Sequence, residues 1–145
     1  MTTHTASLEQ PLPTAARTTT ATKRLWASRA TGGLPALFLL VDGAMKLIKP
    51  AAVVEATVQL GYPESTLVGT GVVLLVSTVL YLLPRTAILG AVLLTGYLGG
   101  AVATHVRTAG PPFNVLFPVV FGALLWIGLW LRDARLRDLL PLRTR

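Results

Sequence analysis

The chain has 145 residues, of which 52% are hydrophobic and only 13% are charged, and its mean hydropathy is +0.64. A soluble domain typically carries about 25% charged residues, so a water-soluble monomer of this composition would have too few polar side chains to cover its surface. The net charge of +7 comes from Lys and Arg that flank apolar runs, which argues against nucleic acid as a partner. The absence of cysteine excludes disulfides, thiol redox centres and thiolate metal sites.

The apolar runs predict an all-α membrane protein, an antiparallel bundle of four transmembrane helices in a domain that covers residues 23–131. Each run is close to the length of about 20 residues that crosses the hydrocarbon core of a bilayer. The predicted spans are residues 30–48, 65–83, 86–106 and 113–131. The short connection at Pro84 and Arg85 allows only antiparallel neighbours.

The segments outside the spans predict two tails and one short helix. Residues 1–22 are rich in Thr and lack an apolar period, which predicts a disordered tail. Residues 132–145 form a basic tail whose leucines are placed to lie on the membrane surface. Residues 51–60 are too few to cross a bilayer, so we expect a short amphipathic helix on the outer side, between the first and second spans.

The distribution of basic residues predicts the orientation in the membrane. With four spans, only Lys46, Lys49 and Arg107 fall on one side, and the other ten of the 13 basic residues fall on the side of the termini. Cytoplasmic loops carry an excess of Lys and Arg, so we expect a multi-pass inner-membrane protein with both termini in the cytoplasm.

Small residues form a stripe along the third predicted span. Gly96, Gly100 and Ala103 share one helical face at spacings of four and three. Small residues at this spacing let two helix backbones approach closely inside a bilayer. The stripe therefore predicts a helix-packing face.

One carboxylate falls inside the first predicted span. Asp42 lies near its middle, where a charged aspartate costs about 2.5–3.5 kcal/mol on insertion scales. Lys46 follows at the i,i+4 spacing that allows an ion pair. Two interpretations stay open: a proton relay or polar anchor in a ligand cavity, and a buried partner for Lys46 or Arg107 that fixes the packing of the helices.

His105 and Tyr97 are the other candidate site residues. His105 lies over Leu94 and Leu98 on a helical wheel, away from the small-residue stripe, and its ring suits proton exchange near neutral pH or a hydrogen bond to a quinone carbonyl. An interfacial histidine bonded to a neighbouring backbone is the plainer alternative. Tyr97 is a candidate for the same cavity or for a hydrogen bond between helices. One histidine with scattered carboxylates does not supply the three or four ligands of a metal site, so no metal is expected.

Three segments together resemble the DoxX-like family of small bacterial membrane proteins. They are residues 38–46, residues 60–64 with the motif Gly-Tyr-Pro-Glu, and the glycine-rich residues 95–107, which end in His-Val-Arg. The resemblance covers residues 34–142 and implies a four-helix inner-membrane protein. Some members of that family are named as subunits of thiosulfate:quinone oxidoreductase or are linked to membrane oxidoreductase complexes.

Three functions remain open from the sequence. The first is an accessory subunit of a membrane redox system with a quinone-sized cavity near Asp42, Lys46, Tyr97 and His105. The second is a non-catalytic scaffold or assembly factor that packs against a membrane partner, or against itself, through the small-residue stripe. The third is a proton-coupled small-molecule transporter with Asp42 as the proton carrier. The sequence leaves open whether the protein is an enzyme.

Overall fold

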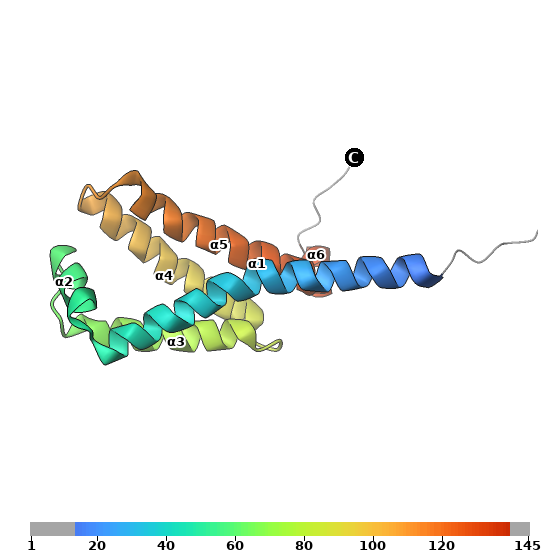
Figure 1. Cartoon of the computed structure of the whole chain (residues 1–145), viewed down its shortest axis with the longest axis horizontal. Coiled ribbons are helices and arrows are strands. Elements are labelled where there is room, and N and C mark those ends of the chain that lie inside the picture. Colours follow the sequence, from blue (N-terminus) through green and yellow to red (C-terminus); the bar gives the residue numbers. More distant parts are fainter. Residues whose placement is uncertain (1–13, 140–145) are drawn as a thin grey trace, which may run out of the picture.

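The computed structural model describes residues 14–139, and over that range the chain is helical and contains no strand. The helices are α1 (Thr14–Ile48), α2 (Ala51–Gln59), α3 (Thr66–Leu82), α4 (Ala87–Arg107), α5 (Pro112–Arg132) and α6 (Ala134–Leu139) (Figure 1). The predicted all-α class is therefore confirmed.

Turn residues end the helices where the sequence changes from apolar to polar. Lys49 has a φ of 55° and precedes Pro50, which cannot continue α1. Gly61 has a φ of 83°, a left-handed conformation that glycine adopts without steric cost, and it lies between α2 and α3. Ala109 has a φ of 49° in the turn before Pro111 and α5. These turns let successive helices reverse direction.

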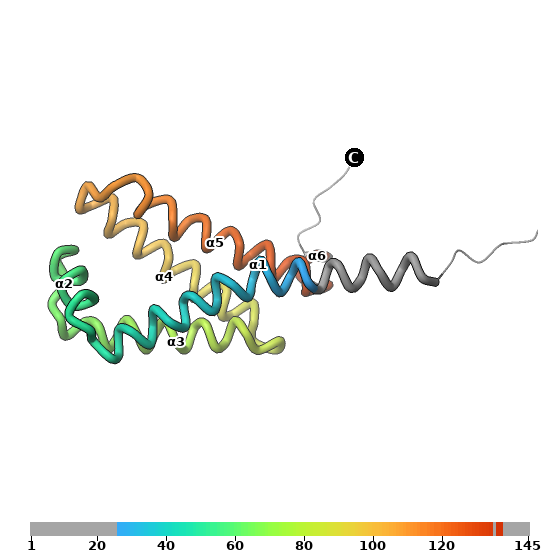
Figure 2. Tube along the Cα trace, in the orientation of Figure 1, coloured from blue at the N-terminus to red at the C-terminus, as the bar shows by residue number. Residues whose placement is uncertain are grey.

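Four helices pack side by side in the order α1, α3, α4, α5, and α5 closes the arrangement by packing against α1. They alternate in direction, and the paths of α4 and α5 diverge from those of α1 and α3 toward the end that carries α2 (Figures 1 and 2). We call this the α2 end of the bundle. The opposite end, with the α3–α4 turn and α6, is the α6 end.

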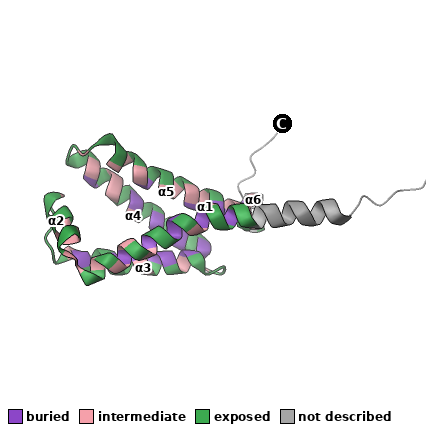
Figure 3. Cartoon of the chain, viewed as in Figure 1, coloured by how far each residue is buried: buried purple, intermediate pink, exposed green. Residues whose placement is uncertain are grey.

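Length and composition make this a membrane protein. Among the described residues, three segments are long and apolar enough to cross a bilayer: Trp26–Ile48 within α1, Ala87–Arg107 and Pro112–Arg132. Large apolar side chains lie exposed along the outward faces of these helices (Figure 3). Apolar surfaces of this kind are suited to contact with lipid. The backbone N–H and C=O groups of a helix bond to each other, so they need no water in the hydrocarbon region. α3 is apolar but has only 17 residues, so four crossings remain a prediction.

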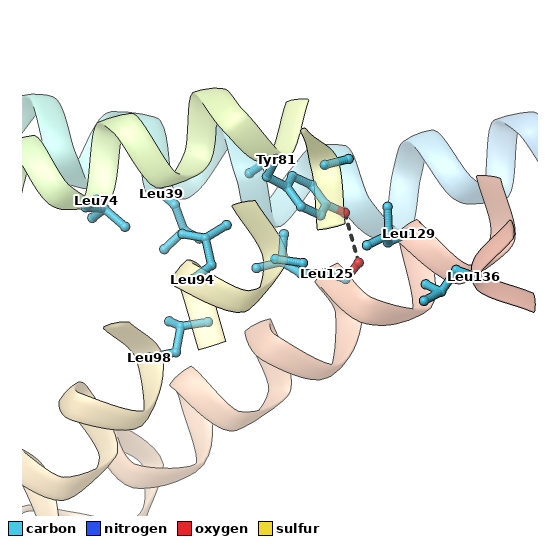
Figure 4. Packing of buried hydrophobic residues seen from close by; sticks show 11 residues of the cluster. Leu39, Leu74, Tyr81, Leu94, Leu98, Leu125, Leu129 and Leu136 are labelled. Atoms are coloured by element: carbon cyan, nitrogen blue, oxygen red, sulfur yellow. Dashed lines mark hydrogen bonds between the residues drawn. The ribbon is translucent and has the colours of Figure 1, made fainter. Parts of the chain in front are cut away.

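The core is a column of leucines contributed by all four bundle helices. The buried set includes Leu39 of α1, Leu74 of α3, Leu94 of α4, and Leu125 and Leu129 of α5 (Figure 4). Tyr81 is also fully buried, and its hydroxyl donates a hydrogen bond of 2.9 Å to the carbonyl of Leu125. This bond satisfies the one polar atom of the Tyr81 side chain and links α3 to α5.

Two pairs of glycines mark close crossings of α1 with its neighbours. A Cβ atom at Gly128 of α5 would lie 2.6 Å from the Cα of Gly32 in α1. A Cβ atom at Gly71 of α3 would lie 3.1 Å from the carbonyl oxygen of Gly43 in α1. α1 is therefore held against both neighbours at positions where only a hydrogen atom fits.

The structure describes part of each predicted tail. α1 begins at Thr14, so it includes residues 14–22, which the sequence assigned to a disordered tail. The chain from Thr14 to Ala30 contains no Gly or Pro and includes several Ala and Arg residues, which favour a helix, so α1 continues through it without a break. The predicted tail over residues 1–13 lies outside the described residues. At the other end, Leu136, one of the leucines of the predicted basic tail, is buried in the core.

Candidate functional site

A small, largely open pocket lies between α4 and α5 near the α2 end. Its volume is about 210 Å³, and it is lined by His105, Phe113, Asn114, Phe117 and Pro118. His105 comes from the last turn of α4, and the other four residues come from the first two turns of α5. We call it the His105 pocket.

The loop after α4 fixes the position of the His105 ring. The amide of Gly110 donates a hydrogen bond of 2.9 Å to the carbonyl of His105, which folds the loop back over the end of the helix. A Cβ atom at Gly110 would lie 3.5 Å from Nδ1 of His105, so the glycine packs directly against the imidazole. The ring is thus held between this loop and α5.

Unused hydrogen-bonding groups face the His105 pocket. Within the described part of the chain, neither the His105 imidazole nor the Asn114 carboxamide forms a side-chain hydrogen bond. Pro118 has no N–H group, so the backbone carbonyl of Asn114, four residues earlier, loses its usual helical donor. His105 and Asn114 thus line the pocket together with two phenylalanines, and polar groups among aromatic walls are the combination that orients a small ligand.

Asp42 and Lys46 form an ion pair on α1. The ammonium nitrogen of Lys46 lies 2.5 Å from a carboxylate oxygen of Asp42, and the side chains are 17% and 34% exposed, respectively. The Lys46 stem packs on α3, where a Cβ atom at Gly71 would lie 2.9 Å from the Lys46 Cβ. Tyr97 of α4 is half-buried against the core and lies within electrostatic reach of Asp42.

The structure divides the predicted site residues into two groups. It brings Asp42, Lys46 and Tyr97 into one region, whereas the lining of the His105 pocket includes none of these three residues. Among the described residues, no three His, Asp or Glu side chains gather in a way that would hold a metal ion.

The small-residue stripe lies on the outside of the bundle. Gly96, Gly100 and Ala103 are exposed, and a Cβ atom at Gly96 or Gly100 would meet no atom of the described chain within 4 Å. The stripe therefore has no packing role among the described helices, and its role as a packing face for another chain stays a prediction.

A polar network closes the α2 end of the bundle. Tyr62 and Thr104 share a hydrogen bond of 2.9 Å, which joins the α2–α3 loop to α4. The guanidinium of Arg107 donates to the carbonyl of Leu60 at 2.9 Å and lies over the Tyr62 ring, 5.7 Å from its centroid. Arg107 thus holds the end of α2 close to the end of α4.

Sequence reasoning missed most of the pocket. The candidate site residues predicted from the sequence do not include Asn114, Phe117 or Pro118. The sequence nevertheless contains a pattern that points to this face of α5. Phe113, Phe117 and Phe121 recur at spacings of four, which places them on one face of a helix. A proline inside the same run then frees a carbonyl beside that face.

The comparison with protein families agrees with the membrane character of the fold. A search of curated proteins and a search of solved structures found no match. The model of the DoxX-like family matches residues 30–128, which include all of α2, α3 and α4 and most of α1 and α5. That match covers more than half of the sequence, so the chain belongs to the DoxX-like family.

Proposed function

We propose that this protein crosses the inner membrane four times, with both termini in the cytoplasm and α2 on the outer side. α3 is about 26 Å long at 1.5 Å per residue, slightly less than the hydrocarbon core of about 30 Å. Local thinning of the bilayer accommodates a mismatch of this size at modest cost. The basic residues concentrated at the α6 end support the cytoplasmic placement of the termini.

We propose that the protein serves as an accessory subunit of a membrane redox system and holds a quinone head group in the His105 pocket. The observation that supports this function best is the pocket itself, in which an imidazole and a carboxamide with unused hydrogen-bonding capacity face Phe113 and Phe117. Its volume of about 210 Å³ suits a single substituted ring, since cavities for larger ligands usually exceed about 300 Å³.

The pocket offers a binding partner for both oxidation states of a quinone. The Asn114 amide or a protonated His105 nitrogen donates a hydrogen bond to a quinone carbonyl, and the Asn114 backbone carbonyl accepts one from a quinol hydroxyl. Histidine is a side chain that commonly relays protons, which suits the proton transfer that accompanies quinone reduction. The electrons come from a redox partner, since a chain without cysteine supplies no thiol step.

Binding of a tail-less benzoquinone to the purified protein in detergent tests this function. We expect His105→Ala and Asn114→Ala each to weaken binding at least tenfold. Tyr97→Phe is the control, because Tyr97 does not line the His105 pocket. Loss of binding in Tyr97→Phe, with His105→Ala unaffected, would place the ligand beside the Asp42–Lys46 pair and refute this assignment.

A scaffold function is the second candidate, and it is supported by the exposure of the small-residue stripe. A Cβ atom at Gly96 or Gly100 meets no neighbouring helix within 4 Å, so we expect leucine at either position to leave the fold intact and to block a partner helix. Gly69→Leu is a matched control, since Gly69 is also exposed and free of neighbours within 4 Å. If Gly96→Leu and Gly100→Leu purify in the same complexes as the wild type, the scaffold function is excluded.

A further inference from the structure

The aromatic wall of the His105 pocket continues beyond the pocket. Phe113 and Phe117 line the cavity, and their ring centroids lie 5.8 Å apart. Phe117 then stacks on Phe121 at 4.2 Å, and Phe38 of α1 meets both rings edge-on, at 5.4 Å and 5.1 Å. We call these four residues the phenylalanine ladder.

The ladder is accessible from the lipid phase. Phe38 is 47% exposed and Phe113 is 69% exposed, and neither Phe117 nor Phe121 is fully buried. A row of aromatic rings at van der Waals spacing, half-open to lipid, offers continuous contact to a flexible apolar chain.

Phe117 connects the His105 pocket to the phenylalanine ladder, because its ring lines the pocket and also packs on Phe121. A ligand with its polar ring at His105 and Asn114 therefore has an apolar path that begins at that ring and follows α5 toward Phe121. A ligand without an apolar chain would occupy only the pocket, and lipid would cover the ladder.

We propose that the natural ligand is an amphiphile with one polar ring and a long apolar chain, and that this chain lies along the phenylalanine ladder. This inference rests on the proposed quinone function and narrows the ligand to long-chain, membrane-resident quinones. Phe117 and Phe121 then act as specificity-determining residues, and His105 and Asn114 bind the ring.

The test compares two benzoquinones with the same ring, one without a chain and one with a decyl chain, in the same detergent. We expect the wild type to bind the decyl compound at least tenfold more tightly. Phe121→Ala should reduce that preference to threefold or less and leave binding of the tail-less compound unchanged, because Phe121 does not line the pocket. Leu116→Ala, an exposed apolar residue of α5 outside the ladder, is the matched control and should keep the full preference.

The outcomes separate this inference from the function on which it rests. If Phe121→Ala keeps the wild-type preference, the ladder does not hold the chain, while binding of the tail-less compound still supports the ring site. If neither compound binds the wild type, both proposals fail.

Should Phe121→Ala not fold, Phe38→Ala takes its place, since Phe38 is half-exposed and contacts Phe121 from α1. A decyl preference that disappears equally in Leu116→Ala would indicate nonspecific lipid-like binding and overturn the inference.

Discussion

At the scale of single residues, glycine has two different roles in this bundle. Gly128 sits where α5 crosses α1, and its backbone lies against the backbone of Gly32. Gly96 and Gly100 of α4 face outward and touch no other described helix. Glycine therefore allows close packing of two helices inside the fold, and on the outside of the bundle it forms a surface that no described helix covers.

Substitution of Gly128 by alanine should destabilise the fold. The new Cβ would lie 2.6 Å from backbone atoms of Gly32, and backbone cannot rotate away as a side chain can. Overpacking of this kind typically costs about 1–3 kcal/mol. We expect a loss in that range in the free energy of unfolding, measured by denaturant titration in mixed micelles. Gly99→Ala is the control, because Gly99 has no neighbour within 4 Å. Equal stability of the two variants would refute the close crossing of α1 and α5.

The Asp42–Lys46 pair gives a second prediction at this scale. Asp42→Asn leaves the partly buried ammonium of Lys46 without its carboxylate, and we expect the free energy of unfolding to fall by about 1–3 kcal/mol. Asp42→Leu combined with Lys46→Leu should restore wild-type stability, because two apolar side chains remove both charges from the bundle. If the double variant is less stable than Asp42→Asn, the ion pair contributes more to the free energy of unfolding than the cancellation of its two charges.

At the scale of elements, α2 depends on contacts that lie outside it. The helix has nine residues and none of them is buried. A helix shorter than about 12 residues is marginal in water by itself. Its attachment therefore relies on the neighbouring α2–α3 loop, through the Tyr62–Thr104 bond and the donation from Arg107 to Leu60.

Removal of these contacts should loosen α2 and leave the bundle folded. We expect Tyr62→Phe combined with Arg107→Met to speed amide hydrogen exchange in residues 51–60 about fivefold or more, since one hydrogen bond contributes about 1 kcal/mol. Exchange in α3 and α5 should not change. Glu55→Gln, an exposed position of α2, is the control. Unchanged exchange in α2 would show that other contacts hold it.

At the scale of the whole molecule, the number of crossings depends on α3. The proposed topology places α2 and the α3–α4 turn on opposite sides of the membrane. The chain has no cysteine, so a single introduced cysteine reports its own location without background.

Labelling with a membrane-impermeant maleimide tests this arrangement. We expect Glu55→Cys to react in intact cells and Arg85→Cys to react only after the membrane is permeabilised. Both positions are exposed, so a lack of reaction reflects the membrane and not burial in the protein. If α3 does not cross, both cysteines will react from the same side.

The sequence by itself determined the helical class, the membrane character and the family resemblance. These properties are local: apolar runs of about 20 residues, turn residues between them, and short motifs can be read without knowing which helix touches which. The i,i+4 pairing of Asp42 with Lys46 was predictable for the same reason, since both residues belong to one helix.

Only the tertiary structure decided which surfaces meet. It placed Gly32 against Gly128, left Gly96 and Gly100 on the outside, and put His105 in a pocket with residues of α5 that the Asp42–Lys46 pair does not line. Each helix has several faces apolar enough to pack or to meet lipid, and inside a bilayer apolarity does not distinguish between them. Shape complementarity at the crossing points makes that choice, and it depends on residues that lie far apart in the sequence.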